Sequence, residues 1–132
     1  MAINRHEEQV RTIVENWANS VREKDIAGIL AHHTSDLLMF DVPPPFQSKG
    51  LKEYTKTWEI FFAWQKDSRV FDILDMTVVA GEDTAFCYAT MRCGGYGHSG
   101  QKEELQFRLT IGLKKVSGEW MIQHEHHSIP AE

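Results

Sequence analysis

The chain has 132 residues and a formal net charge of −5, with 25% charged and 42% hydrophobic residues, which suits one globular domain spanning residues 1–132. The acidic balance argues against a nucleic-acid surface, which needs clustered Lys and Arg, and no apolar run approaches the roughly 18 residues of a membrane span. Because the N-terminus is polar and lacks a signal-peptide core, we expect a cytoplasmic protein with neither a nucleic-acid nor a membrane partner.

The first half of the chain is predicted to be mainly helical. One apolar stripe recurs at helical spacing: Val10, Ile13, Val14, Trp17 and Val21. Asn4 is placed to cap this helix, and Asp25 to cap a short second helix that His32 and His33 would end. A short strand, 37–42, is stopped by three prolines. After Gly50 a third helix carries an aromatic stripe: Leu51, Tyr54, Trp58, Phe61 and Phe62.

The second half is predicted to form strands at about 70–80, 85–93, 104–115 and 120–129. Short glycine-containing turns separate them, so sequential strands should pair antiparallel. Helices first and a sheet afterwards indicate an α+β layout. Cys87 and Cys93 fall in one predicted strand, about 20 Å apart, which predicts buried thiols and no disulfide between them.

The last predicted strand contains three histidines and a glutamate at positions 124–127. Side chains alternate between the two faces of a strand, so Glu125 and His127 share one face, and His124 and His126 the other. The alternation of the preceding strand favours odd positions facing the helices, namely Met121, Gln123, Glu125 and His127. Trp120 and Ile122 would then face outward. A slip of one residue would instead turn His124 and His126 inward.

The order of elements, together with segments 17–41, 81–85 and 118–120, resembles the nuclear transport factor 2 superfamily, which includes ketosteroid isomerases and SnoaL-like polyketide cyclases. The resemblance covers nearly the whole chain and implies a single SnoaL-like domain. It also implies a cone-shaped, curved antiparallel sheet wrapped around three N-terminal helices, a cystatin-like α+β roll. An apolar pocket inside the cone and a homodimer through the outer sheet face are further expectations from this resemblance.

Only some of the catalytic residues of the ketosteroid isomerases have a counterpart at the matching position of this sequence. Ketosteroid isomerases place a general-base aspartate at the end of the first strand, before a proline-containing loop, and Asp41 matches it. Their oxyanion-hole tyrosine on the first helix corresponds to Trp17, whose N–H is a weaker acid than a phenol. Their second donor, a protonated aspartate, would fall near residues 109–111, where no acidic residue stands. Each lost donor costs about 10²–10³ in rate, so ketosteroid isomerase activity is not expected.

The candidate catalytic residues are therefore Asp41, Glu125 and His127, and the candidate ligand-binding residues are Trp17, Tyr54, Trp58 and Gln123. Asp41 is either a general base or a cap for the proline turn. Glu125 and His127 form either an acid/base pair or a hydrogen-bonded patch that shapes the cavity.

Three functions remain open from the sequence. The first is proton transfer, of isomerase, cyclase or hydrolase type, on a small and largely apolar organic substrate without a cofactor. The second is a non-catalytic ligand-binding or dimerisation module. The third is a metalloprotein using the His-rich strand. Because side chains at positions 124–127 alternate between the two faces, only two of these four residues can reach one ion. A third ligand such as Asp41 or His33 would be required, and we predict no metal site.

Overall fold

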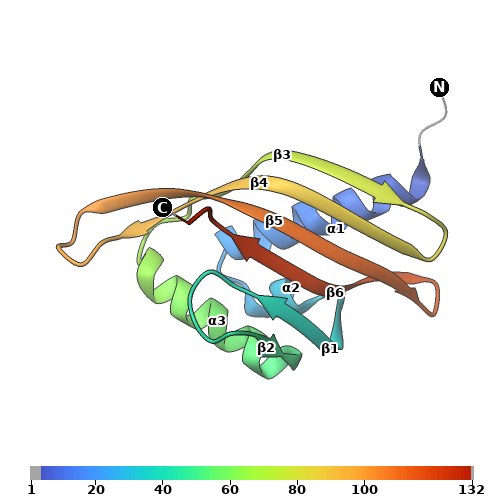
Figure 1. Ribbon diagram of the computed structural model, residues 1–132, viewed down its shortest axis with the longest axis horizontal. Coiled ribbons are helices and arrows are strands. Elements are labelled where there is room, and N and C mark those ends of the chain that lie inside the picture. Colours follow the sequence, from blue (N-terminus) through green and yellow to red (C-terminus); the bar gives the residue numbers. More distant parts are fainter. Residues whose placement is uncertain (1–3, 132) are drawn as a thin grey trace.

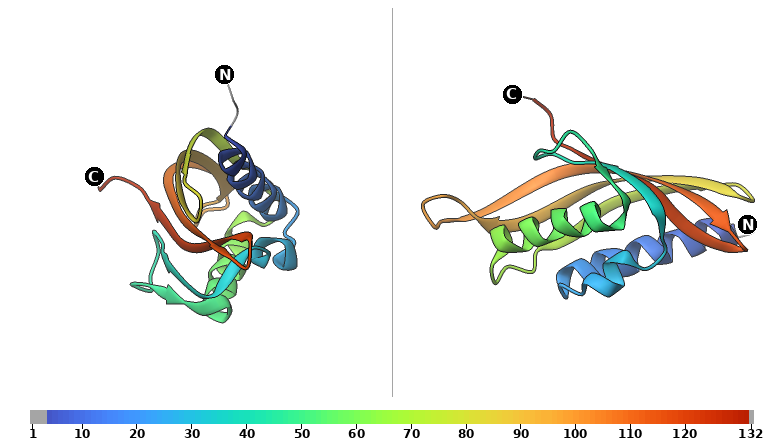
Figure 2. Two further views of the ribbon diagram at one scale, coloured as in Figure 1. Left: turned by 90° about the vertical axis from the view of Figure 1, so that its right-hand side faces the viewer. Right: turned by 90° about the horizontal axis from the view of Figure 1, so that it is seen from below.

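The computed structural model describes residues 4–131. Three helices lie on the concave side of one bent sheet, as two perpendicular views make clear (Figures 1 and 2). The helices are α1 (Arg5–Arg22), α2 (Ile26–Leu30) and α3 (Gly50–Gln65). The strands are β1 (His33–Phe40), β2 (Ser48–Lys49), β3 (Phe71–Ala80), β4 (Thr84–Tyr96), β5 (Lys102–Val116) and β6 (Glu119–Ser128). The predicted α+β roll is confirmed.

Helix starts follow the predicted caps. The side chain of Asn4 accepts a hydrogen bond from the Glu7 N–H at 3.2 Å, and that of Asp25 accepts one from the Gly28 N–H at 3.1 Å. The prediction that His33 ends the second helix is wrong. The helix stops at Leu30, and His32 adopts a left-handed φ of 62°. This turn redirects the chain, so that His33 begins β1 with a buried side chain.

The sheet has the strand order β2-β1-β6-β5-β4-β3. The four long strands pair antiparallel in sequence, as predicted. One pair departs from a purely antiparallel sheet, because β1 runs parallel to β6. Short connections predict antiparallel neighbours, whereas these two strands are separated along the chain by α3 and four strands, so that rule does not apply to them.

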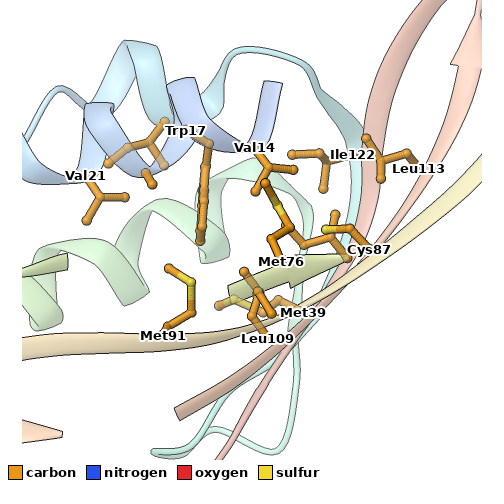
Figure 3. Close-up of a cluster of buried hydrophobic side chains, with 14 of the residues drawn as sticks. Val14, Trp17, Val21, Met39, Met76, Cys87, Met91, Leu109, Leu113 and Ile122 are labelled. Carbon is orange, nitrogen blue, oxygen red and sulfur yellow. The ribbon is translucent and has the colours of Figure 1, made fainter. Parts of the chain in front are cut away.

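The core lies between α1 and the concave sheet face (Figure 3). The apolar stripe of α1 supplies Val14, Trp17 and Val21, which meet side chains from the sheet such as Met91 and Leu109 (Figure 3). Burial of this stripe, about 25 cal/mol per Å² of apolar surface, holds the helix against the sheet. Cys87 and Cys93 are buried free thiols, as predicted.

A bulge in β6 decides which residues face inward. Leu113 of β5 pairs with Ile122, but the neighbouring Gly112 pairs with His124, so Gln123 is an extra residue. Before the bulge, even positions are buried, and after it, odd positions are buried. The inward prediction is confirmed for Glu125 and His127.

The prediction is wrong before the bulge, because parity there is reversed. Trp120 and Ile122, expected on the outer face, are only 3% and 0% exposed. Met121, expected inside, lies on the opposite face, and Gln123 is half-buried in the bulge itself. The extra residue allows the strand to bury two apolar side chains at one end and two polar ones at the other.

Candidate functional site

A cavity of about 350 Å³ lies between α3 and the sheet. Its walls are mainly aromatic and aliphatic side chains: Trp58, Phe61, Trp64, Phe71, Phe107 and Ile129. Its polar lining side chains come from α3, β4, β6 and the loop after β1: Asp41, Thr57, Cys93 and His127. Aromatic walls with a few convergent polar groups are the usual composition of a small-molecule site.

Asp41 and His127 line this same cavity. Asp41 follows the last residue of β1, and His127 lies near the end of β6. The Asp41 carboxylate also accepts a hydrogen bond from the Val42 N–H at 2.8 Å, at the entry to the proline loop. This contact is compatible with the turn-cap interpretation of Asp41, while its place on the cavity wall is where a general base would have to lie.

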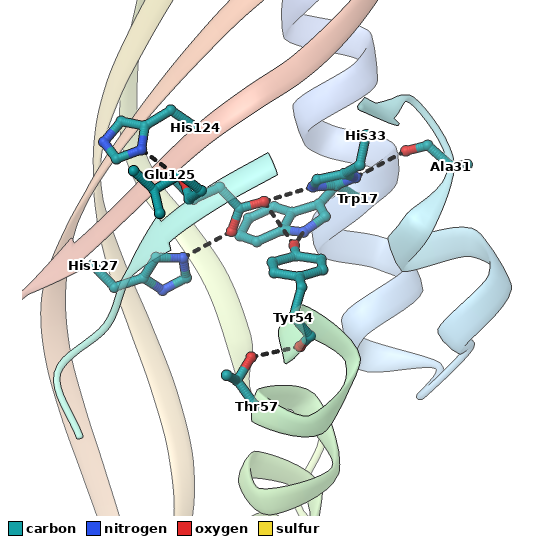
Figure 4. A network of polar contacts seen from close by, with 9 residues as sticks. Trp17, Ala31, His33, Tyr54, Thr57, His124, Glu125 and His127 are labelled. Carbon is teal, nitrogen blue, oxygen red and sulfur yellow. Dashed lines mark hydrogen bonds and ion pairs between the residues drawn. The ribbon is translucent and has the colours of Figure 1, made fainter. Parts of the chain in front are cut away.

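Glu125 is the centre of a buried polar network (Figure 4). Its Oε2 lies 2.6 Å from His33 Nε2 and accepts a hydrogen bond from the Tyr54 hydroxyl at 2.6 Å. Its Oε1 lies 2.9 Å from His127 Nε2. The Trp17 N–H donates to the Tyr54 oxygen at 3.0 Å. Residues from β1, α3 and β6 thus meet at one fully buried carboxylate, and Trp17 of α1 joins the network through Tyr54.

Burial and hydrogen bonding act in opposite directions on this carboxylate. Burial alone raises the pKa of Glu125, but hydrogen bonds and charge from His127 and His33 outweigh it and bring the pKa to about 2. Burial lowers the pKa of His127, while the Glu125 and Asp41 carboxylates raise it, with a net increase. Burial and the neighbouring Glu125 charge raise the pKa of Tyr54 well above 10. The network therefore favours an ionised Glu125 beside a neutral Tyr54.

The His127 ring is held on several sides. Phe107 stacks on it with ring centroids 5.6 Å apart and planes at 6°, and the rings of Trp17 and Trp58 approach edge-on at 6.2 and 6.3 Å. Nε2 is occupied by Glu125, whereas Nδ1 points away from it (Figure 4) and has no hydrogen-bond partner among residues 4–131. Because His127 lines the cavity, Nδ1 is its available polar atom there.

The remaining predicted ligand-binding residues divide into three groups. Trp58 lines the cavity. Trp17 and Tyr54 are not among its lining residues, and their polar atoms belong to the Glu125 network, in which the Trp17 N–H donates to Tyr54. Gln123 does not line the cavity, because the bulge displaces it.

Sequence reasoning missed His33 as a partner of Glu125, and Thr57 and Cys93 as lining residues. His33 and Glu125 are 92 positions apart, and no spacing rule connects them. The aromatic stripe of the third helix did indicate that this helix lines the pocket. Thr57 could have been found from it, because Thr57 directly precedes Trp58. Burial raises the pKa of Cys93 to about 12, so this thiol stays protonated and is a poor nucleophile.

The structure also locates the other histidines of the last strand and the arrangement of possible metal ligands. Within residues 4–131, no three His, Cys, Asp or Glu side chains are arranged to hold a metal ion. His124 and His126 lie around Phe40 away from the cavity, and His124 Nδ1 is 2.7 Å from the Leu38 carbonyl oxygen. No helix in the described part of the chain has the length and apolar character needed to span a membrane.

Comparison with known proteins agrees with this architecture. A family model described as a SnoaL-like domain matches residues 10–132. An NTF2-like protein of unknown function from Pseudomonas putida KT2440 is 33% identical, with a TM-score of 0.84 over 96% of this chain and 87% of its own. The comparison with curated proteins gave no match.

Two more distant structures share the fold. An NTF2-like superfamily protein from Salmonella enterica serovar Typhimurium is 12% identical, with a TM-score of 0.81 over 96% of this chain and 92% of its own. A ketosteroid isomerase-like protein from Erwinia carotovora atroseptica is 16% identical, with a TM-score of 0.75 over 96% and 97%.

Proposed function

Because this chain belongs to the SnoaL-like domain family of NTF2-like proteins, we propose that it binds a small, largely apolar organic molecule and transfers a proton on it. The observation that carries the proposal is that Asp41 and His127 line one cavity with mainly apolar walls. A cavity of about 350 Å³ has the volume of roughly a dozen water molecules at about 30 Å³ each. This favours a molecule of one or two rings.

The proposed chemistry is isomerisation next to a carbonyl group. The Asp41 carboxylate removes a proton from the carbon beside the carbonyl, and the electron pair moves onto the carbonyl oxygen. His127 stabilises that oxygen through an N–H at Nδ1, while Nε2 stays on Glu125. In a ketone with a carbon–carbon double bond next to that carbon, Asp41 then returns the proton to the far end of the double bond as the carbonyl re-forms. The double bond moves into conjugation with the carbonyl, so atoms and charge balance and no cofactor is needed.

The test uses a panel of one- and two-ring ketones in D₂O, with exchange at the carbon beside the carbonyl followed by proton NMR. We expect protein-dependent exchange that falls about 10²-fold or more in Asp41→Asn and His127→Gln, within the usual range for a positioned acid or base. Asp36→Asn and His126→Gln are matched controls, because both residues are exposed on the same two strands. Exchange that survives in Asp41→Asn would contradict the proposal.

A non-catalytic ligand-binding module is the second candidate. The Trp17 N–H donates to Tyr54 and is therefore not free to stabilise an oxyanion. The proposed chemistry then relies on His127 Nδ1 as its N–H donor, and this weaker set of donors favours binding without catalysis. In that case ketones bind, and displace one another, while their exchange in D₂O equals the rate without protein. Titration of tryptophan fluorescence reports binding directly, because Trp58 and Trp64 line the cavity.

We also propose that the protein forms a homodimer through the outer face of the sheet. Phe86 and Tyr88 of β4 are 45% and 50% exposed there, and their rings stack with centroids 6.3 Å apart. Arg92 and Arg108 lie on the same strand faces, among exposed residues. Exposed aromatic side chains beside arginines are typical of a protein interface.

A further inference from the structure

Both ring nitrogens of His33 face oxygen atoms. Nδ1 lies 3.1 Å from the Ala31 carbonyl oxygen, and Nε2 lies 2.6 Å from Glu125 Oε2 (Figure 4). A carbonyl oxygen only accepts hydrogen bonds, so Nδ1 carries a hydrogen. The 2.6 Å contact on the other side then requires a second proton, bound either to Nε2 or to the carboxyl oxygen.

Tyr54 does not supply this proton. The Trp17 N–H is only a donor, so the Tyr54 oxygen accepts from it and the Tyr54 hydroxyl hydrogen points to Glu125 Oε2. That oxygen already receives one hydrogen from Tyr54, and the proton shared with His33 is additional. The His33–Glu125 pair therefore carries one proton more than a neutral imidazole beside a carboxylate, and its net charge is zero.

We propose that His33 is a positioning residue that, by neutralising Glu125, determines whether His127 presents a lone pair or a proton to the cavity near neutral pH. Two partners compete for one carboxylate: His33 on Oε2 and His127 on Oε1. His127 keeps its Nε2–H on Glu125 in both protonation states, and the proposed chemistry needs its Nδ1 hydrogen as well. While His33 supplies the compensating charge, His127 releases this Nδ1 hydrogen at a lower pH than it would beside a Glu125 without His33. The catalytic consequence rests on the proposed function, but the protonation balance does not.

The surroundings of His127 contain few other groups that titrate. Glu125 faces it from β6, Asp41 from the end of β1, and the Cys93 thiol of β4 lines the same cavity. The side chains of β5, α1 and α3 that pack against it are Phe107, Trp17 and Trp58, which are uncharged. The negative charges of Glu125 and Asp41 thus favour the protonated form of His127. The effect of Glu125 is the larger of the two, and His33 opposes it.

Loss of His33 should have a specific result. Without its proton, the Glu125 charge is balanced by His127 alone, so His127 should remain protonated to higher pH. In His33→Gln the neutral amide can still donate a hydrogen bond, so this variant removes the charge and retains a donor. Tyr54→Phe removes a neutral donor from the same carboxyl oxygen, so it should also raise the pH midpoint of His127, by a smaller amount.

The experiment is a pH titration of the histidine ring nitrogens by ¹⁵N–¹H NMR on full-length protein. In His33→Gln we expect the His127 midpoint to rise by about one pH unit, the lower end of the effect of a neighbouring charge. His126→Gln, on the opposite face of the same strand, should leave it unchanged. A folded His33→Gln protein with an unchanged or lowered midpoint would overturn the proposal.

The wild-type spectrum provides a second measurement that needs no variant to fold. His33 must carry a hydrogen on Nδ1 at neutral pH, and a ring protonated only on Nε2 would contradict the proton balance. Neither readout involves turnover. If no ketone exchange is found but the His127 midpoint rises in His33→Gln, the proposed chemistry alone is rejected. If ketone exchange is found but the His127 midpoint does not rise in His33→Gln, the role of His33 alone is rejected.

Discussion

Asp41 and His127 lie at the same end of the sheet because β1 and β6 run parallel to each other. Phe40 of β1 pairs with His126 of β6, so the residues that follow them, Asp41 and His127, lie at the same end of this strand pair. Both side chains then line the cavity beside α3. The parallel pairing of β1 with β6 thus brings a carboxylate and an imidazole from positions 86 residues apart to one site.

Glu125→Gln should destabilise the fold strongly. The side chain is fully buried and contacts three partners, and a neutral amide cannot accept from all of them. Loss of a buried charged partner costs about 3–5 kcal/mol, so we expect the free energy of unfolding in urea at pH 7 to fall by about that amount. The control Glu119→Gln, exposed at the start of the same strand, should change it by less than about 0.5 kcal/mol. Equal stability of both variants would contradict the role of the network.

Stability should decline on both sides of an optimum. The pKa of Glu125 falls from 4.5 to about 2 on folding, so its contribution is present above about 4.5 and is lost as pH falls towards 2. The pKa of His127 rises from 6.5, so its contribution is complete below 6.5 and is lost as pH rises through the folded value. Thermal unfolding from pH 2 to 9 measures this, and Glu125→Gln should lack the acid decline that this carboxylate causes.

The outer-face dimer can be tested by sedimentation at micromolar concentration. A charge at the centre of an apolar interface is left without a partner, so Tyr88→Glu should shift the protein from dimer to monomer. Phe46→Glu is the control, because Phe46 is 95% exposed in the proline loop and not on the sheet. A wild-type monomer under these conditions would refute the assembly.

Purified protein should contain no stoichiometric transition metal. Both oxygens of Glu125 are already occupied by Tyr54, His33 and His127, and a metal ion would have to displace those contacts. Elemental analysis should find well under one zinc or iron per chain, and a chelator should leave the unfolding temperature unchanged. About one metal per chain that is lost in His127→Ala would reverse this conclusion.

Much of the fold could be predicted because its signals are local. The apolar stripe of α1, the cap at Asn4, the four long strands and the inward positions of Glu125 and His127 all follow from periodicity within one segment. Asp41 and Trp58 were also identified as cavity candidates, through the family resemblance and the aromatic stripe. Gln123 was not placed correctly, because periodicity assumes an unbroken register.

The sequence by itself therefore determined the three helices and the four long strands, and which polar side chains of the last strand share a face. Only the tertiary structure decided the bulge at Gln123, the parallel pairing of β1 with β6, and the contact of His33 with Glu125. The physical reason is distance along the chain. Periodicity and capping act over a few residues, whereas register, strand order and the partners of a buried charge depend on how all elements pack around one core.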